Sequence, residues 1–292
     1  MGVRAGSART IGRAAAARQS AKPIGFRKRA LVLWAIATWL INGCATSPAE
    51  RTGALAQRGG ASVDRVLGAG FEHVVFSRNI TANDTTLHIY FSGDGTPWIH
   101  RTQIAPDPTP RDPLELRLML EDPAPSIYIG RPCYLGLAAA PGCKPALWSV
   151  GRYSEAVVDS MAAAVERVLD RSTATQIMLI GYSGGGVLAM LVANRVVRIG
   201  TVVTIAANLD TDAWTRLHDY SALSQSLNPA MIGSWREAMR QIHLVGEHDR
   251  NVPPTLVWNF ASALPNAQVR VIPAFDHRCC WVDAWPTLLK TF

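Results

Sequence analysis

The first 43 residues of this 292-residue chain contain no aspartate or glutamate, although they hold eight of its 29 lysines and arginines. The other residues carry 21 basic and 22 acidic side chains, whose charges nearly cancel. Proteins that bind nucleic acid usually present a basic surface to the phosphate backbone. Because the net charge of +7 belongs to the leading segment, we expect no nucleic acid as a partner of the folded part.

The sequence also lacks an apolar run of about 20 residues, the length that a comfortable membrane-spanning helix needs. Its apolar stretch at residues 30–41 (ALVLWAIATWLI) is shorter and follows the basic triplet Arg27-Lys28-Arg29. A short apolar segment behind a positive one is typical of a secretory signal peptide. The next residues, Ile41-Asn42-Gly43-Cys44, resemble a bacterial lipobox, in which the cysteine becomes the lipidated first residue of the mature chain. An uncleaved signal-anchor helix with an incidental cysteine is the alternative.

The lipobox reading predicts where the protein resides. Residues 1–43 would be the signal peptide, and a lipid on Cys44 would hold the exported protein in the cell envelope. Ala45, where an aspartate could stand, resembles the pattern of lipoproteins that are sent on to the outer membrane, so we expect the protein there, facing the periplasm. Residues 44–65 are small and polar without periodicity, so we expect a flexible tether there. No internal repeat follows, and we expect one domain at 66–292.

Cysteine is scarce, with five residues in all. With Cys44 lipidated, an even number remains for an oxidising compartment, so we expect disulfides, in any of three pairings, among Cys133, Cys143, Cys279 and Cys280. A metal site of Cys279, Cys280 and His277 is a weaker alternative, because adjacent cysteines lack the two-residue gap of common zinc ligand pairs. We expect neither a metal nor another cofactor.

The remaining sequence alternates strand-like and helix-like segments. Runs rich in β-branched and aromatic residues predict strands at 71–77, 86–91, 126–130, 176–180, 201–206, 241–245 and 268–272. Apolar residues at helical spacing predict helices at 113–121, 155–169, 184–197, 254–264 and 281–289. Several strands are apolar throughout, which indicates a mostly parallel sheet with helices on both faces. We therefore expect an α/β fold, with residues 210–235 forming a small insertion over the site.

Four glycines surround one serine in Gly181-Tyr182-Ser183-Gly184-Gly185-Gly186. This G-x-S-x-G pattern lies between a predicted strand and a predicted helix, where a tight turn would expose the serine at a helix N-terminus. A glycine-rich turn that binds phosphate or is purely structural is the plain alternative. In this context the motif resembles the nucleophile elbow of the α/β-hydrolase superfamily, and the resemblance extends from about residue 66 to the end.

The resemblance implies a catalytic triad in the order serine, acid, histidine. Ser183 would be the nucleophile, Asp249 in the loop after strand 241–245 the acid, and His277 after strand 268–272 the base. Glu247 is a less favoured acid, and Asp210 and Asp212 are a third option whose other role would be to cap a helix. We expect the two remaining nearby histidines to be structural; they are His243 and His248.

The same resemblance implies an oxyanion hole, in which backbone N–H groups stabilise the developing negative charge. The N–H of Gly184 would supply one donor. The loop Phe91–Trp98 (FSGDGTPW) resembles an H-G-G-G type of oxyanion loop with Ser92 in place of the histidine, and the N–H of Asp94 or Gly95 would supply another. The Asp94 carboxylate would then have to point away or pair with Arg101 or Arg131. A simple β-turn is the alternative for this loop.

These residues together predict a serine hydrolase that forms an acyl-enzyme at Ser183, with a small-molecule or lipid-like ester or thioester as substrate. Peptidase or amidase activity is an alternative, and so is a lipid-anchored binding protein that has kept the fold without the chemistry. Three stretches resemble a group of bacterial lipoprotein hydrolases: FSGDGTPW, GRPCYLG with its downstream WSVGRYS, and HRCCWVDAWP. Apolar side chains in the insertion favour an acyl or aromatic group in the substrate; they are Trp214, Leu217, Tyr220 and Leu223.

Overall fold

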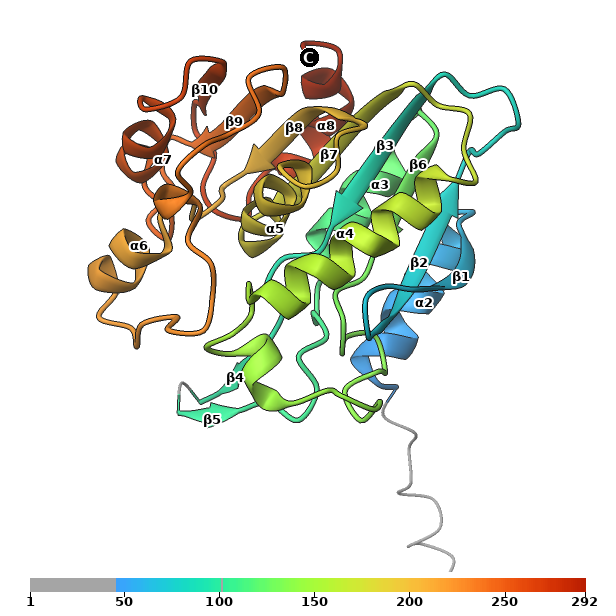
Figure 1. Cartoon of the computed structure of the whole chain (residues 1–292), viewed down its shortest axis with the longest axis horizontal. Coiled ribbons are helices and arrows are strands. Elements are labelled where there is room, and N and C mark those ends of the chain that lie inside the picture. The colour runs from blue at the N-terminus through green and yellow to red at the C-terminus, as the bar shows by residue number, and fades with distance from the viewer. Residues whose placement is uncertain (1–45, 101) are drawn as a thin grey trace, which may run out of the picture. The chain divides into compact units, whose positions relative to one another are not determined.

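The computed structural model describes residues 46–100 and 102–292 (Figure 1). The predicted signal peptide and Cys44 therefore lie outside the described residues. Within the described ranges, every helix is too short or too polar to cross a membrane.

An eight-stranded sheet forms the centre of the described domain (Figure 1). Its strands lie in the order β1 (Ser62–Leu67), β2 (Glu72–Arg78), β6 (Ser126–Ile129), β3 (Thr86–Phe91), β7 (Gln176–Tyr182), β8 (Ile199–Ile205), β9 (Arg240–Gly246) and β10 (Ala267–Ile272). β2 pairs antiparallel with both of its neighbours, and every pair from β6 to β10 is parallel. The predicted α/β class with a mostly parallel sheet is confirmed. A separate hairpin of β4 (Trp98–Ile99) and β5 (Gln103–Ile104) was not predicted.

The sheet is buried on both faces because its strands carry apolar side chains in both directions. Along β3, Leu87, Ile89 and Phe91 belong to the cluster on one face, whereas Tyr90 belongs to the cluster on the other. This is the two-residue period of a strand, with neither face left polar. The apolar runs in the sequence follow from this double burial.

Helices cover the two faces in separate groups (Figure 1). α4 (Glu155–Leu169) and α5 (Gly184–Ala193) contribute to one apolar cluster, and α3 (Leu114–Glu121) and α8 (Trp281–Leu289) contribute to the other. α7 (Pro254–Ala261) lies against β9 and β10. The insertion contains α6 (Thr211–Leu217) and the 3-10 turn η2 (Pro229–Met231), and a further turn, η1 (Pro145–Trp148), precedes α4.

The flexible tether predicted at 44–65 is wrong over its described part. Residues Pro48–Arg58 form the helix α2, and β1 begins at Ser62. The Ser47 hydroxyl accepts from the Glu50 N–H at 3.1 Å, and the Glu50 carboxylate accepts from the Ser47 N–H at 2.7 Å, which is a capping box. Ala56 of this helix is fully buried. The folded domain therefore begins near residue 46 and not at 66.

The parallel strands bring distant loops together. The carboxyl ends of neighbouring parallel strands lie at one edge of a sheet, where α/β proteins bind their ligands. In this sheet β3 neighbours β7, followed by β8, β9 and β10. The loops after β3, β7, β9 and β10 contain the predicted oxyanion loop, Ser183, Asp249 and His277, so the fold gathers all of these at a single edge.

Candidate active site

Ser183 lies in a sharp turn between β7 and α5. Its φ of 51° is on the left-handed side, where a residue with a Cβ is strained and where functional residues concentrate. The Ser183 N–H donates to the carbonyl of Ile205, at the end of the neighbouring strand β8, at 2.8 Å, and the Gly186 N–H closes the turn by donating to the Ser183 carbonyl at 2.9 Å. The chain therefore holds the serine in an unfavourable conformation at the start of a helix.

The glycines beside Ser183 are required by close backbone approaches. A Cβ added to Gly181 would lie 2.2 Å from the carbonyl oxygen of Gly185, and one added to Gly185 would lie 2.4 Å from that of Phe91. Both distances are well inside van der Waals contact, and backbone atoms cannot move aside as a side chain can. The G-x-S-x-G pattern is thus explained by the close approach of the two arms of the turn at Gly181 and by the packing of Gly185 against β3.

Asp249 and His277, which are separated by 28 residues in sequence, are hydrogen-bonded to each other. The His277 Nδ1 lies 2.9 Å from Asp249 Oδ2. The other carboxylate oxygen accepts from the N–H groups of Asn251 at 2.8 Å and Val252 at 2.7 Å. Because the Asp249 side chain is fully buried and acts only as an acceptor, it holds the proton of a neutral imidazole on Nδ1 and leaves Nε2 as the basic atom.

The Nε2 atom of His277 is hydrogen-bonded to Asn251 and has no hydrogen bond to Ser183. The Asn251 Nδ2 lies 3.0 Å from His277 Nε2. Among the described residues, Ser183 Oγ has no hydrogen-bond partner, although the ring of the adjacent Tyr182 lies 5.2 Å from the His277 ring. Catalytic hydrogen bonds in apo active sites are often loose and tighten only with substrate, and the separation of Ser183 from His277 Nε2 is of this kind.

The alternative acids have other partners. The Glu247 carboxylate lies 3.8 Å from His248 and accepts from the Ala274 N–H at 3.0 Å. Asp210 caps α6 by accepting from the N–H groups of Asp212 at 3.1 Å and Ala213 at 3.0 Å, the structural role that the sequence left open for it.

His243 is fully buried beside Thr204, whose hydroxyl lies 2.8 Å from the His243 Nδ1. Burial lowers the pKa of His243 to about 3, because a charged imidazolium would lose its hydration there. It stays neutral at ordinary pH and acts as a structural residue of β9.

The loop after β3 approaches the N-terminus of α5. The N–H of Gly93 donates to Glu115 and that of Thr96 to the Pro108 carbonyl at 2.9 Å. Between them, the N–H groups of Asp94 and Gly95 have no acceptor among the described residues. A Cβ on Gly184 would lie 2.0 Å from Asp94 Oδ1, so this loop contacts the start of the helix. The arrangement supplies free donors beside the free N–H that begins α5.

The Asp94 carboxylate is paired, as an oxyanion loop would require. Arg131 donates to its Oδ1 at 2.7 Å, Arg152 to its Oδ2 at 2.8 Å, and the Tyr153 hydroxyl lies within 2.9 Å of both oxygens. Burial alone would raise the pKa of Asp94, but the charges of Arg152 and Arg131 outweigh it and lower the pKa to about 2. The predicted partner Arg101 lies outside the described residues.

Glu115 supports the same loop from α3. Its buried carboxyl group accepts the Gly93 N–H. Burial raises its pKa to about 7, and the hydrogen bonds from the backbone and the charge of Arg131 limit the rise. Sequence reasoning missed Glu115, Arg152 and Tyr153. The signal in the sequence for Arg152 and Tyr153 was the stretch WSVGRYS, downstream of the stretch GRPCYLG that contains Arg131. Glu115 lies in neither stretch.

Several solved structures resemble this chain over most of its length, although they share little sequence identity with it. Est1E from Butyrivibrio proteoclasticus has a TM-score of 0.54 at 12% identity, with 79% of this chain and 96% of that chain covered. XC6422 from Xanthomonas campestris, an α/β serine hydrolase without lid, has a TM-score of 0.52 at 13% identity, covering 79% and 94%. A membrane phospholipase A has a TM-score of 0.50 at 14% identity, covering 91% and 96%. The chain has the α/β-hydrolase fold.

Sequence comparison adds no relative to this α/β-hydrolase fold. No protein-family model matches the chain. No curated protein matches it in sequence either. The low identities to the solved structures show the fold alone, so the roles of the site residues depend on the geometry described above.

The four cysteines of the α/β-hydrolase domain form two disulfides, Cys133 with Cys143 and Cys279 with Cys280. This is one of the three pairings that the sequence left open. The second disulfide lies between His277 and α8, where the alternative metal site was considered. No group of three or more potential metal ligands occurs among the residues that the structure describes.

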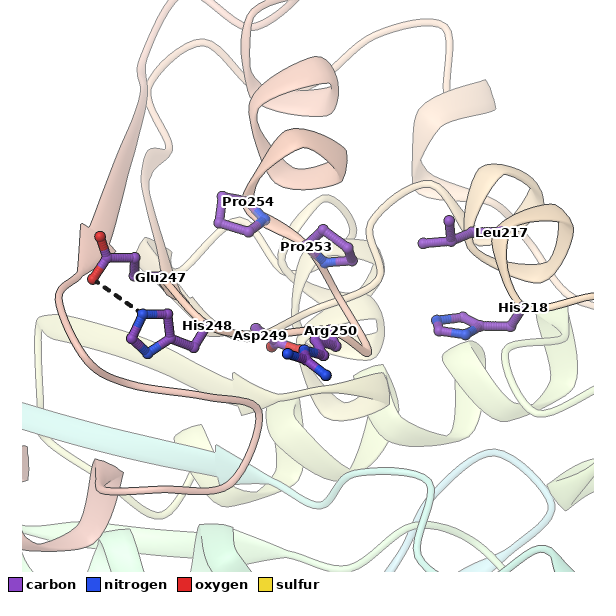
Figure 2. A pocket seen from close by; sticks show the side chains of 8 residues that line it. All are labelled: Leu217, His218, Glu247, His248, Asp249, Arg250, Pro253 and Pro254. Carbon is purple, nitrogen blue, oxygen red and sulfur yellow. Dashed lines mark ion pairs between the residues drawn. The ribbon is translucent and has the colours of Figure 1, made fainter.

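A hollow of about 630 Å³ lies between α6 and the loop that contains Asp249 (Figure 2). Leu217 and His218 line one side; the other is lined by Glu247, His248, Asp249, Arg250, Pro253 and Pro254. Leu223 lines a separate hollow of about 370 Å³. Trp214 and Tyr220 pack against each other with ring centroids 5.3 Å apart. The predicted roof residues thus divide between two hollows and an aromatic contact, and neither hollow includes Ser183 in its lining.

Proposed function

We propose that this protein is a serine hydrolase that cleaves carboxylic esters through an acyl-enzyme at Ser183. The observation that carries the proposal is the Asp249–His277 hydrogen bond of 2.9 Å at the sheet edge where Ser183 is held in a strained turn. A serine hydroxyl becomes a useful nucleophile only when a nearby base removes its proton. The structural neighbours, which include an α/β serine hydrolase, support hydrolysis as the reaction class.

In the proposed reaction, Ser183 Oγ attacks the substrate carbonyl carbon while His277 Nε2 accepts the hydroxyl proton. Asp249 keeps the Nδ1 proton in place and stabilises the imidazolium that forms. The carbonyl oxygen becomes an oxyanion, which the N–H of Gly184 and that of Asp94 or Gly95 stabilise. The tetrahedral intermediate collapses when His277 protonates the leaving alcohol. Water then attacks the carbonyl carbon of the acyl-enzyme while His277 accepts its proton. His277 returns that proton to Ser183 Oγ as the bond between Oγ and the acyl carbon breaks, and the acid leaves.

Lipid-like esters or thioesters are the substrate class that we favour. The membrane phospholipase A found among the solved structures supports a lipid ester, and the apolar side chains of the insertion agree with an acyl chain. Peptidase or amidase activity is the second candidate, because the same triad can cleave amides. We further propose that a lipid on Cys44 holds the exported enzyme on the bacterial outer membrane facing the periplasm. Labelling with an alkyne-bearing fatty acid, lost in Cys44→Ser, would test the anchor.

Labelling by a fluorophosphonate probe tests the proposed nucleophile. We expect the wild type to be labelled at Ser183, and Ser183→Ala and His277→Ala to lose labelling and ester hydrolysis by at least about 10⁴-fold. Ser62→Ala and His100→Ala, at exposed positions outside the triad loops and the hollow, are matched controls that should react like the wild type. If the folded wild type resists the probe, the protein has kept the fold as a binding module and the proposal fails.

A further inference from the structure

Asn251 connects three parts of the site through separate atoms. Its backbone N–H donates to Asp249 Oδ1 at 2.8 Å, and its side-chain Nδ2 lies 3.0 Å from His277 Nε2. Its carbonyl oxygen accepts from Trp214 Nε1 at 3.0 Å and from His218 Nε2 at 2.7 Å. Trp214 belongs to α6 and His218 is its C-terminal cap. One residue thus links the acid, the base and the helix of the insertion.

The hydrogen bond to His277 occupies the atom that the proposed reaction needs. A neutral imidazole with its proton on Nδ1 has one lone pair on Nε2. Asn251 Nδ2–H donates to this lone pair, which therefore cannot at the same time accept the proton of Ser183. Ser183 Oγ is correspondingly without a hydrogen-bond partner in the described part of the chain. His277 is correctly oriented by Asp249 but occupied at its basic atom.

We propose that Asn251 is a positioning residue that holds His277 in a resting arrangement and releases Nε2 to Ser183 when α6 shifts. This inference rests on the proposed function, in which Nε2 accepts the Ser183 proton. The hollow in Figure 2 lies between α6 and the loop of Asn251. A substrate group bound there would contact Leu217 and His218 on one side and the loop on the other, so its binding can move the two apart.

The first test measures whether the side chain of Asn251 restrains the base. Asn251→Ala and the similarly sized Asn251→Leu remove the amide donor and keep the backbone contacts to Asp249 and α6. Releasing one neutral hydrogen bond should accelerate fluorophosphonate labelling of Ser183 on the order of fivefold. Asn259→Ala, at an exposed position of α7, is the matched control and should leave the rate unchanged. A residue with only a structural role would slow labelling when removed, and slower labelling in both variants would overturn the proposal.

A second readout does not depend on Ser183 being reactive. Diethyl pyrocarbonate modifies an imidazole nitrogen that has a free lone pair, and mass spectrometry locates the modified histidine. We expect modification of His277 to be on the order of fivefold faster in Asn251→Ala than in the wild type, with the exposed His248 as an internal reference. An unchanged rate at His277 would refute the restraint. Absence of probe labelling at Ser183, with faster His277 modification, would instead refute the proposed function alone.

The link to α6 is tested by a double-mutant cycle. Trp214→Phe keeps an aromatic ring and removes the N–H that donates to the Asn251 carbonyl. If α6 acts through Asn251, Trp214→Phe should speed both the labelling of Ser183 and the modification of His277 when Asn251 is present. The same change should add nothing in the Asn251→Ala background, because the effects of coupled residues are not additive. Equal effects of Trp214→Phe in both backgrounds would mean that α6 acts independently, and would overturn this part of the inference.

Discussion

The buried carboxyl of Glu115 makes a prediction about the dependence of stability on pH. Glu115 lies on α3, is 4% exposed and accepts the N–H of Gly93 in the predicted oxyanion loop. Glu115→Gln is the perturbation of choice, since glutamine keeps an oxygen acceptor for Gly93 and cannot ionise. The variant therefore isolates the cost of placing a charge at this position.

The magnitude follows from the change in pKa on folding. Burial raises the pKa of Glu115 from 4.5 to about 7, so the folded protein binds this proton more tightly than the unfolded chain does. The stabilisation is fully present below about pH 4.5 and is lost as the pH rises through 7. Its full size is about 3 kcal/mol, since each pH unit corresponds to about 1.4 kcal/mol. Above pH 8 the wild type should have lost nearly all of it.

Urea unfolding followed by tryptophan fluorescence measures this effect. The free energy of unfolding is compared between wild type and Glu115→Gln at several values from pH 4.5 to 8.5. We expect the wild type to lose about 3 kcal/mol relative to the variant over this range. Glu121→Gln, at the exposed end of the same helix, should follow the wild type. A difference between wild type and Glu115→Gln that stays flat with pH would refute the reasoning.

Three further predictions concern Asp94, the neighbouring Gly184, and the disulfide between Cys133 and Cys143. Asp94→Asn should lower the free energy of unfolding by about 3–5 kcal/mol at neutral pH, because Arg131 and Arg152 lose their buried counter-charge. Since the pKa of Asp94 is lowered from 3.8 to about 2, this difference should be full above about pH 4 and shrink by about 2 kcal/mol as the pH falls to 2; a difference of unchanged size at pH 2 would contradict it. Gly184→Ala would place a Cβ 2.0 Å from Asp94 Oδ1 and so displace the oxyanion loop. Probe labelling of Ser183 should fall by about 10²-fold or more with the fold retained; normal labelling would show that the loop can move aside without loss of function. Cys133→Ser with Cys143→Ser opens a loop with a sequence separation of 10 and should cost about 2–3 kcal/mol in urea unfolding; an unchanged midpoint would count against it.

Local sequence patterns were sufficient for most of the fold. The bounds predicted for β3, α4 and α8 agree with the structure at both ends, because the strand and helix periods are carried by neighbouring residues. α5 ends at Ala193, earlier than the predicted residue 197. α2 was missed because its buried residues are the small Thr52 and Ala56, which give a weak apolar period. Its capping box at Ser47 and Glu50 was visible in the sequence and was the better signal.

The residues that hold the oxyanion loop in place were harder to predict than the catalytic motifs, because their roles depend on contacts between residues far apart in the sequence. Arg131 follows β6, which neighbours β3 in the sheet, so the order of strands already places it near Asp94. Arg152 reaches the same carboxylate across 58 residues, and Glu115 reaches Gly93 across 22. A buried carboxylate near a developing oxyanion is tolerable only when cations neutralise it. A partner for Asp94 was therefore expected from the sequence, and Arg131 was one of the two candidates. Only the packing of the loops around β3 identifies Arg152 and Tyr153 as further partners of this carboxylate.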